Sequence, residues 1–104
     1  MKEVACTELK KMMDAKENFQ LIDVREELEA DIATIGGELI PMGDIIDNLD
    51  KISKEKKVVV YCRSGKRSAA IVQALEQNGF SNIYNLKGGI TAWADEVDTT
   101  MAKY

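Results

Sequence analysis

The chain has 104 residues, and 45% of them are hydrophobic, which is enough for one hydrophobic core but not for two. Its 18 acidic and 14 basic residues give a net charge of −4, which argues against nucleic acid and anionic membranes as partners. The absence of histidine excludes Cys–His dyads, serine triads and histidine-ligated metals, so any chemistry must proceed without imidazole.

The hydrophobic pattern predicts strands that alternate with helices along the chain. We expect strands at 3–5, 20–24, 38–40, 58–61 and 83–86, and helices at 7–15, 26–30, 44–49, 67–78 and 89–94. This alternation predicts an α/β fold with a parallel sheet and helices on both faces. We expect a single domain over 1–104, with a folded core over about 4–96 and a flexible tail over 97–104, because the last residues are polar and unpatterned.

No apolar run approaches the roughly 18 residues that a membrane span needs, and the start of the chain lacks the apolar segment of a secretory signal. Two cysteines in a chain of this size fit a reducing compartment better than a disulfide framework. We therefore expect a cytoplasmic protein with no membrane partner.

A nucleophile is indicated at Cys62, directly after the strand predicted at 58–61. That strand is apolar without alternation, as in strands buried on both faces of a parallel sheet. Cys62 would then lie at the carboxyl end of a strand, where open α/β sheets bind their ligands.

The loop after Cys62 has the composition of an anion-binding cradle, with three cations and no acid. Its residues are Arg63, Ser64, Gly65, Lys66, Arg67 and Ser68. Gly65 can take a positive φ without steric cost, so several N–H groups can point at one spot, together with the positive end of the next helix. Such a setting stabilises a thiolate. We predict that Cys62 is a thiolate at neutral pH and that the loop binds an anionic substrate.

Two plainer interpretations compete with this one. Cys62 could be a buried small hydrophobe, because free cysteine is among the most buried residue types. The loop cations could be an ordinary solvated surface. A basic loop in an acidic chain favours the catalytic interpretation over both.

Three sequence blocks in this order resemble the rhodanese family of sulfurtransferases. The blocks are Leu21-Ile22-Asp23-Val24-Arg25, Cys62-Arg63-Ser64-Gly65-Lys66-Arg67-Ser68, and Asn85-Leu86-Lys87-Gly88-Gly89 with Ala92-Trp93. The resemblance covers most of the chain and implies a central five-stranded parallel sheet around the Cys62 loop. Segment 33–41 is most similar to rhodanese modules attached to E1-like adenylating enzymes.

The resemblance implies a persulfide cycle, with the covalent Cys62 persulfide in place of a bound cofactor and with no metal site. Cys62 would take a sulfane sulfur from thiosulfate or another small anionic persulfide donor. It would pass the sulfur to cyanide, a thiol or a carrier protein. A protein donor or acceptor is therefore an expected partner.

Two other functions stay open at this point. A cysteine-dependent phosphatase or an arsenate reductase would use a similar thiolate, although phosphatases carry Cys-x5-Arg and here only four residues separate Cys62 from Arg67. The chain could also be a persulfide-carrying interaction module with little turnover alone.

The other polar or reactive residues in the motifs are expected to be structural. Asp23 and Arg25 at a strand end would hold the next loop through charge-assisted bonds. Trp93 would pack on the sheet. Cys6 shows no redox spacing with Cys62 and is expected to be a structural or incidental thiol.

Overall fold

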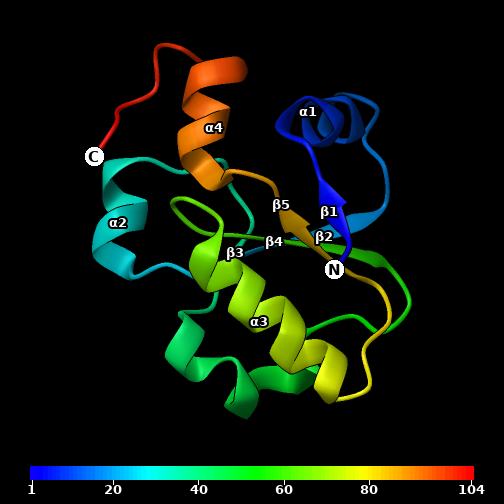
Figure 1. Ribbon diagram of the computed structural model, residues 1–104. Helices are drawn as coiled ribbons and strands as arrows, with labels where there is room; N and C mark the ends of the chain where they lie inside the picture. The colour runs from blue at the N-terminus through cyan, green and yellow to red at the C-terminus, as the bar shows by residue number, and fades with distance from the viewer.

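The computed structural model describes all residues from 1 to 104, and a parallel sheet runs through its centre (Figure 1). The strands are β1 (Glu3–Val4), β2 (Phe19–Asp23), β3 (Glu38–Leu39), β4 (Lys57–Tyr61) and β5 (Ile83–Leu86). Their order in the sheet is β1-β5-β4-β2-β3, and every pair is parallel. The prediction of a five-stranded parallel sheet is confirmed, with β4 at its centre.

Helices cover both faces of this sheet. They are α1 (Cys6–Asp14), α2 (Glu27–Ile32), α3 (Lys66–Gln77) and α4 (Gly89–Glu96), with two 3₁₀ helices, η1 (Met42–Asp44) and η2 (Ile46–Lys51). Figure 1 shows α1 and α4 on one face and α3 with the 3₁₀ helices on the other. No helix has the length and apolar character that a membrane crossing needs.

The two faces have separate hydrophobic cores because β4 alternates its side chains between them. Val58, Val60 and Cys62 belong to the core under α3, whereas Val59 and Tyr61 belong to the core under α1 and α4. All four β4 residues in this set are fully buried, as the unbroken apolar run predicts. Cys62 therefore continues the α3 side of the strand past its last hydrogen-bonded residue.

The prediction of an α-helix at 44–49 is wrong, because this part of the chain belongs to the two 3₁₀ helices η1 and η2. Asn48 has a non-helical backbone, with φ of −128°, and its side-chain amide donates to the Asp44 carbonyl at 2.7 Å. Asn and Asp side chains that bond to nearby backbone groups compete with regular helix formation. The other helices and strands, including the second helix at Glu27–Ile32, lie within two residues of their predicted bounds at each end.

The sequence predicts a flexible tail over residues 97–104, here called the C-terminal segment. In the structure they fold back along α4 and end beside α2. Val97, Met101 and Tyr104 pack against the core under α1 and α4. The sequence does not predict this packing, because the three apolar residues lie among polar ones and are spaced too widely to indicate a helix or a strand.

Candidate active site

Cys62 lies at the carboxyl edge of the central strand, where the chain turns from β4 into α3. Its side chain is almost fully enclosed, and the residue is 1% exposed. The N–H of Ile90 donates to the Cys62 carbonyl at 2.9 Å, and that of Thr91 donates to the Arg63 carbonyl at 3.0 Å. N–H groups in the first turn of α4, which have no partner within the helix, therefore donate to carbonyls of the active-site loop and fix the loop in place.

The Cys62 sulfur accepts hydrogen bonds from the first turn of α3. The N–H of Gly65 lies 3.1 Å from Sγ, the N–H of Ser68 lies 3.4 Å away, and the Ser68 hydroxyl lies 3.3 Å away. These donors are preorganised because backbone N–H groups at a helix start have no partner within the helix. The loop therefore surrounds one sulfur atom with hydrogen-bond donors, as the sequence predicts.

The surroundings of Cys62 lower the pKa of its thiol below the ordinary value near 9.0. Burial alone would raise it, but this effect is outweighed by the Ser68 hydroxyl and by the N–H groups of Ser68, Gly65 and Ser64. Cys6 is the opposite case, because burial and the Glu96 charge raise the pKa of its thiol to about 11. The two cysteines of the chain thus differ in the direction of their shift, and only Cys62 is prepared for nucleophilic attack.

Gly65 has the left-handed conformation that the sequence predicts, with φ of 102°, at the cap of α3. A side chain at this position would meet only ordinary contacts, so backbone conformation rather than space makes glycine suitable here. The turn at Gly65 lets the Gly65 and Ser68 N–H groups converge on the same atom.

Asn85 on β5 is a buried site residue that the sequence reasoning missed. Its Nδ2 donates to the Gly65 carbonyl at 3.2 Å, and its Oδ1 accepts the Ser68 hydroxyl at 2.5 Å. The Ser68 hydroxyl has a single hydrogen, which it can give to Asn85 or to the Cys62 sulfur. Asn85 therefore supports the cradle from the neighbouring strand. The signal in the sequence is an amide inside an otherwise apolar strand, just before Gly88-Gly89.

The loop cations are arranged differently from expectation. Arg67 makes a two-pronged ion pair with Glu29 of α2, at 2.7 and 2.8 Å, so its charge is compensated. The Arg67 guanidinium lowers the pKa of the Glu29 carboxyl to about 2, and the pair stays charged at neutral pH. Arg63 and Lys66 are exposed and make no ion pair. Only these two remain as free cations of the loop.

A chain of hydrogen bonds links the Arg67–Glu29 pair to the buried end of β2. Arg25 and Asp23 form a buried two-pronged ion pair, with Nη2–Oδ2 at 2.8 Å and Nε–Oδ1 at 2.9 Å. Arg25 Nη1 donates to the Tyr104 hydroxyl at 2.8 Å, and that hydroxyl donates to Glu29 Oε1 at 3.1 Å. The structural role predicted for Asp23 and Arg25 is confirmed by these bonds.

The remaining motif residues also have the structural places that the sequence predicts. Trp93 is buried in the core under α1 and α4. Cys6 lies in the same core, on α1, and faces the Lys87 and Gly89 carbonyls. No disulfide joins it to Cys62, and both thiols are free.

A family model for the rhodanese-like domain matches residues 5–96. The chain belongs to the rhodanese family. The match leaves out the C-terminal segment, which includes Tyr104.

Individual relatives support this assignment. The chain is 39% identical over 100 residues to a Mycobacterium tuberculosis protein named as an adenylyltransferase/sulfurtransferase, MoeZ. The aligned region covers 93% of this chain but only 26% of MoeZ. A Bacillus subtilis protein named as a sulfurtransferase, YtwF, is 38% identical over 97 residues, with 92% and 93% of the two chains covered. The crystal structure of a rhodanese-like domain protein from Staphylococcus aureus is 37% identical, covers 93% and 95% of the two chains, and has a TM-score of 0.83.

MoeZ confirms the similarity to rhodanese modules joined to adenylating enzymes that segment 33–41 indicates. This chain spans about a quarter of the length of that protein.

Proposed function

We propose that the protein is a sulfurtransferase in which Cys62 carries a sulfane sulfur from thiosulfate or another anionic persulfide donor to a thiophilic acceptor. The observation that carries this proposal is the ring of donors around the Cys62 sulfur, formed by Gly65 and Ser68 at the start of α3. Donors fixed before reaction stabilise developing negative charge without reorganisation. Membership of a family whose relatives are named sulfurtransferases supports it.

In the loading step, the Cys62 thiolate attacks the outer sulfur of thiosulfate. A bond forms between Sγ and that sulfur, the S–S bond of thiosulfate breaks, and sulfite leaves with the electron pair. Cys62 then bears a persulfide anion, which the Gly65 and Ser68 N–H groups are placed to stabilise. No proton needs to move, so the step is compatible with a chain that has no histidine.

In the discharge step, a nucleophile such as cyanide or a thiolate attacks the outer sulfur of the persulfide. The Sγ–S bond breaks and its electron pair returns to Sγ, which regenerates the Cys62 thiolate. We include in this proposal a cytoplasmic location and no resident metal or cofactor. A carrier protein as donor or acceptor is also part of it, supported by the union of adenylyltransferase and sulfurtransferase in the name of MoeZ.

The ion pair of Arg67 argues against the phosphatase alternative. Phosphate binding by arginine relies on a guanidinium that presents two N–H groups to the anion. Arg67 presents them to Glu29 instead, and it follows Cys62 after four residues rather than five. The cradle thus offers backbone N–H groups to sulfur but no arginine fork to a phosphoryl group.

Incubation with thiosulfate followed by intact mass measurement tests the proposal. We expect a gain of about 32 Da, located on the peptide that contains Cys62, and its loss on addition of cyanide. Turnover of an aryl phosphate without this adduct would contradict the proposal and favour a phosphatase. An adduct that neither cyanide nor small thiols discharge would contradict turnover and favour the interaction module.

A further inference from the structure

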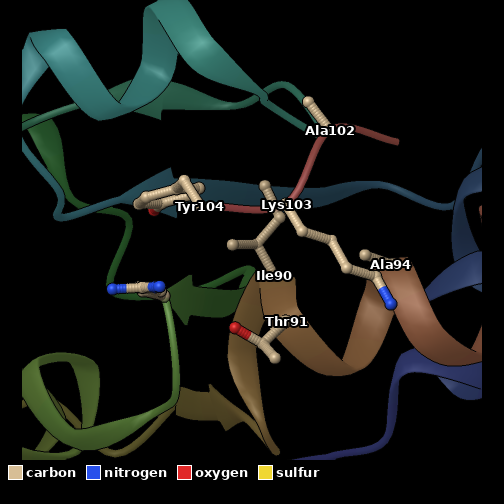
Figure 2. Close-up of a pocket in the computed structure, with 7 residues that line it drawn as sticks. Ile90, Thr91, Ala94, Ala102, Lys103 and Tyr104 are labelled. Carbon is tan, nitrogen blue, oxygen red and sulfur yellow. The ribbon is translucent and has the colours of Figure 1, made fainter. Parts of the chain in front are cut away.

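The C-terminal segment and α4 enclose a pocket beside the active-site loop (Figure 2). Its volume is about 220 Å³. The lining residues come from three parts of the chain and are Arg63, Ile90, Thr91, Ala94, Ala102, Lys103 and Tyr104. Figure 2 shows the Tyr104 ring from the C-terminal segment and the Ile90 and Thr91 side chains from α4 around the same space. Because the family match ends at residue 96, one wall of this pocket lies outside the family pattern.

The wall formed by the C-terminal segment is anchored at several points. The Tyr104 hydroxyl is held between Arg25 and Glu29, at 2.8 and 3.1 Å. Met101 and Tyr104 pack on the core under α1 and α4, and Lys103 pairs with Asp95 of α4. The segment that forms this wall is therefore held in place by both polar and apolar contacts.

The opposite wall is bonded directly to the backbone of the nucleophile. The Ile90 and Thr91 N–H groups donate to the carbonyls of Cys62 and Arg63. A molecule held against the first turn of α4 thus lies against the same turn that fixes Cys62.

Arg63 gives the pocket a free positive charge. It is the only arginine of the chain without a carboxylate partner, because Arg25 pairs with Asp23 and Arg67 with Glu29. Its guanidinium carbon lies 4.7 Å from the centre of the Tyr104 ring, a stacking distance that restricts the side chain while leaving its N–H groups able to bind an anion. The other cation of the pocket, Lys103, is compensated by Asp95.

Ile90, Ala94 and Ala102 make the rest of the lining largely apolar, with the Thr91 hydroxyl as a neutral polar group. A free guanidinium beside an apolar wall suits a small molecule that has both a short carbon chain and a carboxylate. The pocket volume of about 220 Å³ is several times the ~30 Å³ that one water molecule occupies in the liquid. A diatomic anion such as cyanide would therefore fill only a small part of the pocket.

We propose that this pocket binds the carboxylate-bearing part of a small thiol that accepts sulfur from Cys62, with Arg63 as its anion-binding residue and Tyr104 as the residue that positions Arg63. The inference rests on the proposed function and names the acceptor class. The acceptor thiolate attacks the outer sulfur of the persulfide, the Sγ–S bond breaks with its electron pair on Sγ, and the acceptor leaves as a persulfide. The carboxylate takes no part in this bonding and serves only to hold the thiol.

The test follows discharge of preloaded Cys62 persulfide by intact mass, with 3-mercaptopropionate as the anionic thiol and 2-mercaptoethanol as the neutral one. Rates are compared per concentration of thiolate. We expect the anionic thiol to react about tenfold faster at low concentration and to show saturation. A chain of net charge −4 would by itself repel the anionic thiol, so this preference requires positive charge near Cys62, and saturation indicates that the thiol binds before it reacts.

Four variants separate the pocket from general electrostatics. Arg63→Gln and Tyr104→Leu are expected to lose most of the anionic preference, whereas Tyr104→Phe keeps the ring and should retain it. Lys11→Gln removes an exposed charge on α1, outside the pocket, and should also retain it. Equal rates for the two thiols in the unaltered protein, or an unchanged preference in Arg63→Gln, would overturn the inference while leaving the proposed function intact. If no persulfide forms at all, the proposed function fails and this inference fails with it.

Discussion

Replacement of Cys62 by serine is expected to abolish sulfur transfer, with a loss of at least about a thousandfold. The hydroxyl is close in size to the thiol but cannot accept and release a sulfane sulfur, because the nucleophile of the covalent step is gone. The fold should persist, since a hydroxyl can accept the same bonds from Gly65 and Ser68. The readouts are thiocyanate formation from thiosulfate and cyanide, and thermal unfolding as a check on the fold.

Cys6 supplies the matched control for this variant. It is the only other cysteine, it is buried on α1, and it lies outside the loop. Cys6→Ala should lower stability by about 1 kcal/mol or somewhat more through the lost packing, but it should keep the transfer rate. Transfer that survives in Cys62→Ser, or disappears in Cys6→Ala with the fold intact, would show that the nucleophile has been assigned to the wrong residue.

Replacement of Gly89 by alanine is expected to damage both the fold and the site. Gly89 has φ of 62°, and a Cβ there would lie 2.5 Å from the carbonyl oxygens of both Cys62 and Arg63. Neither oxygen can move without shifting the peptide that carries the nucleophile. We expect a loss of roughly 2–5 kcal/mol in the free energy of unfolding, from backbone strain and overpacking.

The same variant should lower kcat/KM for sulfur transfer on the order of 100-fold, because small displacements of a reacting group are costly. Gly43→Ala is the matched control, since no atom lies within 4 Å of a Cβ built at that position. Chemical denaturation and thiocyanate assays on the two variants measure both effects. Wild-type kinetics and stability in Gly89→Ala would mean that α4 does not press against the loop as the structure shows.

The arrangement of the nucleophile follows from local sequence. An apolar run, a cysteine and a glycine before an amphipathic pattern are enough to predict a buried strand, a tight turn and a helix start. The structure shows each of them, with Gly65 at positive φ and Sγ facing the amides of the first helical turn. The strand, the turn and the helix start each depend on residues within one short stretch of chain, so they can be predicted from the local sequence pattern.

The support around the loop could not be predicted in the same way. Glu29 meets Arg67 across 38 positions of sequence, and Tyr104 meets Arg25 across 79. A carboxylate on a short helix and a tyrosine in a polar tail carry no local sign of such partners, because periodicity and turn chemistry describe only neighbouring residues. Their pairing changes the electrostatics of the site, since it leaves Arg63 and Lys66 as the free loop cations.

The pH dependence of Cys62 alkylation shows directly whether the loop keeps this sulfur ionised. Reaction with iodoacetamide, resolved by peptide mass, reports the thiolate fraction at each cysteine of the same molecule. We expect Cys62 to react with a midpoint below 9.0, while Cys6, whose pKa is raised to about 11, stays protected through that range. A Cys62 midpoint at or above 9.0 would contradict a sulfur held ionised by the loop amides, and with it the persulfide mechanism.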